Sequence, residues 1–121
     1  MKTVKQQEEN DCGVACVAML AGVPYTLARA AIYLNGKSKL TKTKDLRAAL
    51  QKLGRKPLAD RRRPFGSQTP RDLKTDALVF VEMDDGHDSK HWVVWDAKKK
   101  KIRDPYHTKM SHRIRGYLAV G

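Results

Sequence analysis

The chain of 121 residues is poor in cysteine and in long apolar runs, and both shortages exclude classes of protein. Its two cysteines, Cys12 and Cys16, are too few for the disulfide framework of a small secreted domain. No apolar run approaches the roughly 20 residues that cross a bilayer. Polar residues replace the apolar core of a signal peptide in "MKTVKQQEEN". We therefore expect one domain over residues 1–121, cytoplasmic where it is made and without a transmembrane segment.

Acidic residues are also scarce, because 25 Lys and Arg face only 13 Asp and Glu, which gives a net charge of +12. Such an excess attracts nucleic acid, an anionic membrane surface or an acidic peptide or protein. Nucleic acid has no support beyond the charge itself, because no helix-turn-helix or RNA-binding signature accompanies it and aromatic residues make up only 7%. Arg61, Arg62 and Arg63 fall in a predicted exposed loop, and the sequence leaves their role open.

Hydrophobic periodicity predicts three helices in the first half of the chain. Residues 12–22 are apolar on every face, which is typical of a buried central helix, with Asp11 as its N-cap and Gly22 at its end. Two amphipathic helices follow, at residues 26–36 and 43–54, the second with Thr43 as its cap. Their predicted buried faces are Leu27, Ala30, Ala31 and Leu34, and Leu46, Ala49, Leu50 and Leu53.

The second half of the chain contains short segments rich in valine and aromatic residues, which predict strands at residues 76–83, 91–95, 101–105 and 114–120. Residues 60–72 have no apolar period and several turn formers, so they predict an exposed loop. Helices followed by an antiparallel meander make an α+β fold, with the helices packed on a C-terminal sheet.

Cys12 stands where a polar leader becomes the apolar helix, and this position favours a reactive thiol. Backbone N–H groups and the helix dipole stabilise a thiolate at a helix N-terminus. Cys16, one turn further into the apolar helix, is predicted to be a packing residue.

A nucleophilic cysteine needs a histidine base, which is itself oriented by a carboxylate or an amide. The chain has four histidines, and His91 begins a predicted strand, which gives it a rigid mount. Asp104 lies near the end of the next strand, and a turn near residues 98–100 would bring it opposite His91. The other candidates are His87, His107 and His112.

Attack on a carbonyl also requires donors for the oxyanion, such as a side-chain amide and the backbone N–H of the nucleophile. Gln6 and Gln7 both precede Cys12 and could supply the amide. Their position alone does not choose between them.

Three short blocks, in order along most of the chain, resemble the C39 family of bacterial papain-like cysteine peptidases. They are Gln6 five residues before "DCGVACVAML", then "HWVVWD", then "DP". The resemblance implies a papain-like fold without a cofactor or bound metal. It implies Cys12 as nucleophile, His91 as general base, Asp104 as the residue that orients His91, and Gln6 as oxyanion donor. It also implies hydrolysis of a peptide or protein substrate through a thioester, after small residues such as Gly-Gly in a leader peptide.

Departures from the family pattern keep other functions open. We expect a stand-alone domain, because residues 1–121 contain no transmembrane or nucleotide-binding region. The charges of the loops at residues 60–72 and 83–90 differ from the family pattern and argue against the usual leader-peptide specificity. A papain-like site can also carry out deamidation or acyl transfer, because different acceptors resolve the thioester. Two rivals need no peptidase chemistry: a zinc site of Cys12 and Cys16 with His87 and His91, and a basic nucleic-acid-binding module.

Overall fold

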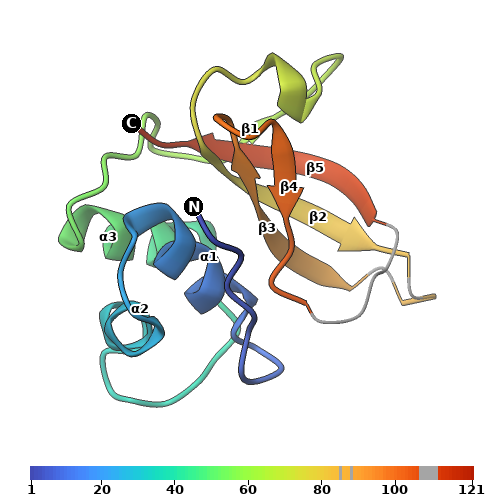
Figure 1. The fold of residues 1–121 in the computed structure, drawn as a ribbon. Helices are drawn as coiled ribbons and strands as arrows, with labels where there is room; N and C mark the ends of the chain where they lie inside the picture. Colours follow the sequence, from blue (N-terminus) through green and yellow to red (C-terminus); the bar gives the residue numbers. More distant parts are fainter. Residues whose placement is uncertain (85, 88, 107–111) are drawn as a thin grey trace.

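The computed structural model describes residues 1–84, 86–87, 89–106 and 112–121. Three helices come first and lie together on one side of a five-stranded antiparallel sheet (Figure 1), which confirms the predicted α+β class. The helices are α1 (Cys12–Ala21), α2 (Tyr25–Ile32) and α3 (Thr43–Lys52), with a short 3-10 helix, η1 (Pro70–Asp72), further on. The strands are β1 (Arg63–Pro64), β2 (Ala77–Met83), β3 (Lys90–Asp96), β4 (Lys101–Arg103) and β5 (His112–Ala119).

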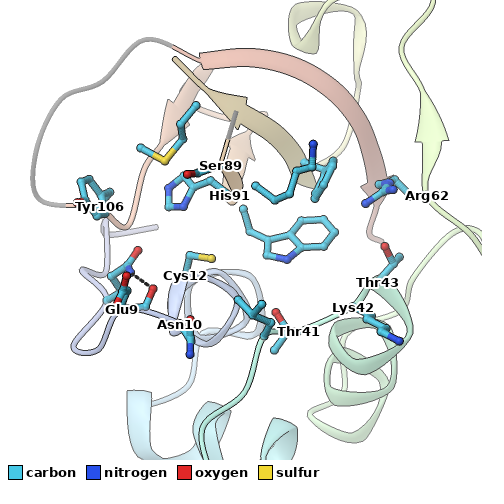
Figure 2. Close-up of a pocket in the computed structure, with 16 residues that line it drawn as sticks. Glu9, Asn10, Cys12, Thr41, Lys42, Thr43, Arg62, Ser89, His91 and Tyr106 are labelled. Atoms are coloured by element: carbon cyan, nitrogen blue, oxygen red, sulfur yellow. Dashed lines mark hydrogen bonds between the residues drawn. The ribbon is translucent and has the colours of Figure 1, made fainter. Parts of the chain in front are cut away.

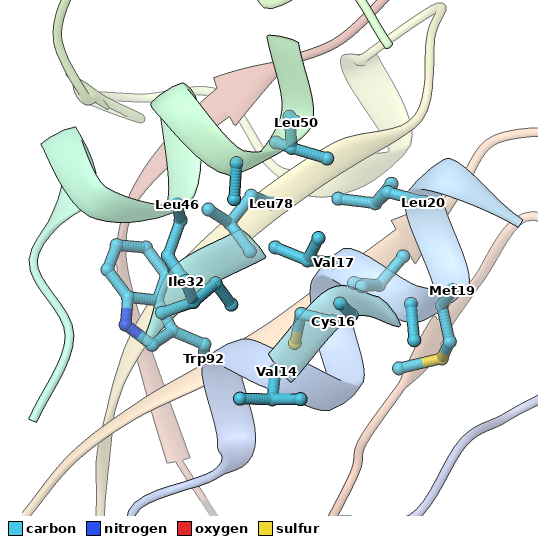
Figure 3. Packing of buried hydrophobic residues seen from close by; sticks show 14 of the residues in the cluster. Val14, Cys16, Val17, Met19, Leu20, Ile32, Leu46, Leu50, Leu78 and Trp92 are labelled. Carbon is cyan, nitrogen blue, oxygen red and sulfur yellow. The ribbon is translucent and has the colours of Figure 1, made fainter. Parts of the chain in front are cut away.

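Helix α1 is the centre of the molecule, as its uniformly apolar sequence predicts. Every residue from Gly13 to Leu20 is buried, and the helix ends at Gly22, whose φ of 67° is the left-handed conformation that favours glycine. Figure 3 shows its side chains among those of α2, α3 and the sheet, including Leu46, Leu78 and Trp92. This packing fixes the position of the helix start, where Cys12 lies.

Helix α2 is shorter than predicted and buries a different face. It ends at Ile32, so Leu34 lies beyond it with 78% of its surface exposed, and Leu27 is 51% exposed. Ala28 and Ile32 are buried in their place, together with Tyr33 just after the helix. Apolar side chains occur on more than one face of this segment, so its hydrophobic periodicity does not choose between the faces. Contacts with the rest of the fold bury the face of Ala28 and Ile32.

Helix α3 buries Leu46, Ala49 and Leu50 as predicted, but its N-cap is Lys42 rather than Thr43. The reason is a local hydrogen bond, because the Lys42 backbone N–H donates to Asp45 Oδ2 at 2.9 Å, three residues into the helix.

The sheet has the strand order β1-β5-β2-β3-β4, so the predicted simple meander is wrong for its last strand. Although β5 follows β4 along the chain, it pairs with β2 along the edge of β2 that is opposite β3. The predicted exposed loop at residues 60–72 is also partly wrong, because β1 pairs with β5, and Phe65 is buried on the sheet face opposite the helices. Apolar side chains of this loop fill a second small core there, as the sheet would otherwise expose that face.

In the part of the chain that is described, no single helix is long and apolar enough to cross a membrane. α1 and α2 meet such a requirement only as a pair, by length and composition, with a bend of 117° between them.

Candidate active site

A cleft of about 680 Å³ opens between the start of α1, the loop before α3 and strands β2 and β3. Cys12 and His91 both line it, and Figure 2 shows their side chains facing each other, with Tyr106 beside His91. The cleft therefore brings together two of the residues that the sequence analysis selected separately.

Cys12 is the first residue of α1, and the residues around it fix the helix start closely. Gly13 is buried against the loop before α3, where a Cβ would come within 2.7 Å of Thr41 Oγ1 and 2.8 Å of Leu46 Cδ2. Only glycine permits this approach without a shift of the neighbours. The N–H groups of the first helical turn have no carbonyl partner inside the helix, which favours an anion beside them.

His91 lies between Cys12 and Asp104. Its Nε2 is 2.7 Å from Asp104 Oδ1, which also accepts a hydrogen bond from the Tyr106 backbone N–H at 2.9 Å. The second ring nitrogen, Nδ1, is then the one available to the Cys12 thiol, which faces the ring across the cleft (Figure 2). Asp104 follows Arg103, which pairs with Val94, so the β3–β4 hairpin places the carboxylate near His91 as predicted.

The environment of His91 favours its protonated form. Burial disfavours the imidazolium, but the hydrogen bond with Asp104 and then the interaction with Cys12 outweigh it and raise the pKa of His91 to about 9. Burial likewise raises the pKa of Asp104, but the hydrogen bonds from His91 and the Tyr106 N–H lower it below its ordinary value. The raised pKa of His91 and the lowered pKa of Asp104 both favour an imidazolium beside a carboxylate at neutral pH.

The N-terminal segment runs along the chain that follows β4. Lys5 Nζ donates to the carbonyls of Asp104 and Tyr106 at 3.2 Å each, and the Gln6 N–H donates to Pro105 O at 2.9 Å. Further back, Arg103 donates to Thr3 Oγ1 and to the buried Asp96. These contacts hold Gln6 at the cleft next to the loop that carries Asp104.

Gln6 lines the cleft, but its amide is engaged within its own turn. Its Nε2 donates to the carbonyls of Glu8 and Glu9, each at 3.0 Å. Within the described residues, Gln6 Oε1 is buried with no hydrogen-bond partner. Gln7 is exposed and is not part of the cleft wall.

Asp11 occupies the N-cap position of α1, but its side chain does not cap the helix, contrary to the sequence prediction. The carboxylate is fully buried and accepts hydrogen bonds from the hydroxyls of Tyr25 at 2.7 Å and Tyr33 at 2.8 Å. Burial and the Asp11 carboxylate raise the pKa of Tyr33 to about 12. This network ties α1 to α2 directly behind Cys12, and no sequence pattern pointed to it.

The remaining candidates lie elsewhere. Cys16 is fully buried in the core, as predicted, and burial raises the pKa of its thiol. His87 is exposed, His112 begins β5, and His107 lies outside the described residues. Among the described residues, no three His, Cys, Asp or Glu side chains are grouped so that they could hold a metal ion.

The raised pKa of His91 predicts that stability falls as pH rises from about 6.5, the ordinary histidine value, to about 9. Over this window the folded protein holds a proton that the unfolded chain has lost, so each step up in pH favours unfolding. The full loss is on the order of 3 kcal/mol. Urea unfolding at both pH values should show it, and His91→Asn should flatten the dependence. Equal slopes in both proteins would contradict the assignment.

Comparison with known proteins identifies the family of the chain. The family model of the Peptidase C39 family matches residues 1–115, nearly the whole chain and every residue of the cleft. No curated protein matches the chain. The chain therefore belongs to the Peptidase C39 family and is a cysteine peptidase.

Proposed function

We propose that the cleft is the active site of this peptidase, with Cys12 as nucleophile, His91 as its acid and base, and Asp104 as the residue that orients His91. The observation that carries the proposal is the position of the His91 ring, which pairs with Asp104 through Nε2 and faces Cys12 in the cleft (Figure 2). Thiol catalysis requires a nucleophile beside a base, with a third group that orients the base, and the three side chains are arranged in this order in space.

In the first half of the reaction, the Cys12 sulfur attacks the carbonyl carbon of the scissile peptide bond. The electron pair of the C=O bond moves onto oxygen, which becomes an oxyanion. Its donors are the Cys12 backbone N–H and the Gln6 amide, once the amide exchanges a bond to Glu8 or Glu9 for the oxyanion. The C–N bond then breaks as the His91 imidazolium gives its proton to the leaving amine, which leaves a thioester on Cys12.

In the second half, neutral His91 accepts a proton from a water molecule as the water oxygen attacks the thioester carbonyl. The C–S bond breaks, the acid product leaves, and the thiolate and imidazolium are restored. Asp104 keeps Nε2 protonated throughout, so Nδ1 always faces the sulfur. The substrate is a peptide or protein, and the family resemblance supports a scissile bond after a pair of small residues such as Gly-Gly.

If Cys12 forms a thiolate with His91, iodoacetamide near pH 6 should modify Cys12 much faster than Cys16, by at least about 100-fold. The physical reason is that only the thiolate reacts, and Cys16 is buried with a raised pKa. Both cysteines lie in one tryptic peptide, residues 6–29, so fragment-ion mass spectrometry of that peptide over time locates the label and measures both rates. Equal rates, or faster modification of Cys16, would contradict the assignment.

The reaction itself is tested by incubating the protein with a peptide library, and Cys12→Ala serves as the inactive control. Hydrolysis gives two fragments with a new carboxyl terminus at the cleavage site. Deamidation would leave one chain with an acid in place of an amide, and acyl transfer would join a fragment to a second amine. The fragments also reveal whether cleavage follows Gly-Gly.

A further inference from the structure

The cleft continues beyond Cys12 and His91 to a second region, formed by Arg62, Lys42 and two aromatic rings. Phe80 and Trp92 pack edge to face, with ring centroids 5.0 Å apart. The Arg62 guanidinium lies over Phe80, 3.9 Å from the ring centroid, and 5.9 Å from the Trp92 ring. In Figure 2 Arg62 and Lys42 lie on the side of the cleft away from Tyr106 and Glu9. The region combines an apolar floor with positive charge.

The backbone is shaped to bring Arg62 to this position. Pro64, Gly116, Phe80 and Trp92 form one row across four strands of the sheet. A Cβ on Gly116 would come within 2.9 Å of Arg62 Cγ and 3.0 Å of the Arg63 carbonyl oxygen. The Arg62 stem can therefore cross β5 only because residue 116 has no side chain, and its guanidinium then reaches the aromatic floor.

The cations at this end of the cleft have no carboxylate partner among the described residues. Glu82 accepts ion pairs from Lys90 and Arg115, so those cations are already compensated. By contrast, neither Arg62 nor Lys42 forms an ion pair with any carboxylate in the described part of the chain. A cation stacked on an aromatic ring keeps its N–H edge free for an anion, and a carboxylate matches that edge in two hydrogen bonds.

We propose that this region is a specificity subsite for an acidic side chain of the peptide substrate, bound by Arg62 with Lys42 beside it. The inference rests on the proposed function, because it places the substrate in the same cleft. Trp92 is next to His91 in β3, and an extended peptide advances about 3.3 Å per residue. The acidic residue therefore lies within about four residues of the scissile bond, and the substrate backbone between them covers Phe80 and Trp92.

Two neighbours provide a matched control. Arg61 and Arg63 are exposed like Arg62 and carry the same charge, but neither lines the cleft. General attraction of an acidic peptide to a chain of charge +12 would be weakened equally by the loss of any of the three. Binding of the peptide at a specific subsite would be weakened only by the loss of Arg62.

The test measures how peptides protect Cys12 from iodoacetamide, a readout that works wherever in the peptide cleavage occurs. The probes are Ala-rich decapeptides with a central Gly-Gly and one Glu at successive positions, each with a Gln twin. We expect at least one Glu peptide to protect at about tenfold lower concentration than its twin, because a carboxylate can form charge-assisted hydrogen bonds with a guanidinium that is held over an aromatic ring. Arg62→Gln should remove this difference, Arg61→Gln should keep it, and Arg62→Glu should favour a Lys peptide instead.

The outcomes separate this inference from the proposed function. Slow alkylation of Cys12 without any peptide would contradict the proposed function. Rapid alkylation with equal protection by every Glu and Gln twin would overturn the subsite alone. Equal losses in Arg61→Gln and Arg62→Gln would also overturn it, because they would show general attraction by the surface charge.

Discussion

Cys12→Ala and His91→Ala should each lower turnover of a cleaved peptide by more than about 10⁴-fold, with the fold intact. Removal of the sulfur abolishes the thioester, and removal of the imidazole leaves neither a partner for the thiolate nor a proton for the leaving amine. Both side chains face the cleft, so truncation opens no large cavity in the core. Fragment release is followed by mass spectrometry, and circular dichroism checks the fold.

Asp104→Asn and Cys16→Ala are the matched controls for these losses. In Asp104→Asn the new amide oxygen can still accept from the imidazole, so turnover should fall less than in His91→Ala. Because the carboxylate raises the pKa of His91, its loss should also move the alkaline limb of the pH profile downward. Cys16→Ala should reduce stability but leave turnover almost unchanged. Full activity in His91→Ala would contradict the role of His91 and would point to His87 or His107 as the base.

The parts of the fold that the sequence predicts well are those where local pattern and packing agree. The segment of α1 is apolar on all sides, so any arrangement that buries it makes it central. The strands β2 and β3 are rich in Val and aromatic residues, and their bounds follow from polar flanks. For these elements, no long-range contact was needed to choose between structures.

Other parts depend on contacts that a single sequence does not display. The position of β5 beside β2 joins strands that are distant along the chain, and β1 exists only because β5 offers it an edge. The buried face of α2 depends on contacts with the rest of the core, and Tyr33, just after the helix, donates a hydrogen bond to Asp11 at the start of α1. A carboxylate buried between two tyrosines looks like an ordinary N-cap in the sequence.

In the candidate site, too, some features follow from local sequence and others depend on long-range contacts. His91 and Asp104 could be paired from the sequence because one hairpin turn controls their approach. Arg62 was indistinguishable from Arg61 and Arg63, because its place over Phe80 depends on the absence of a side chain at Gly116, on a strand far along the chain. The sequence also could not show that the Gln6 amide is engaged by Glu8 and Glu9.

Because the Gln6 amide is hydrogen-bonded to Glu8 and Glu9, Gln6 can act either as an oxyanion donor or as a residue that holds the turn before Cys12. Gln6→Ala should lower kcat by roughly 10- to 1,000-fold with little change in KM, because an oxyanion donor acts only on charge that develops in the transition state. Gln7→Ala should change neither constant, since Gln7 is exposed and outside the cleft wall. A purely structural role would instead alter KM and the turn before Cys12.

Alkylation separates the two roles of Gln6 further. Iodoacetamide reacts with the Cys12 thiolate by displacement at carbon, and no oxyanion forms on a carbonyl. Gln6→Ala should therefore keep the rapid alkylation of Cys12 while turnover falls. If the variant lost both together, Gln6 would act by holding the helix start, through its bonds to Glu8 and Glu9, and not as an oxyanion donor. Gln6→Glu, which keeps the length but replaces the donor by an acceptor, should match Gln6→Ala in turnover.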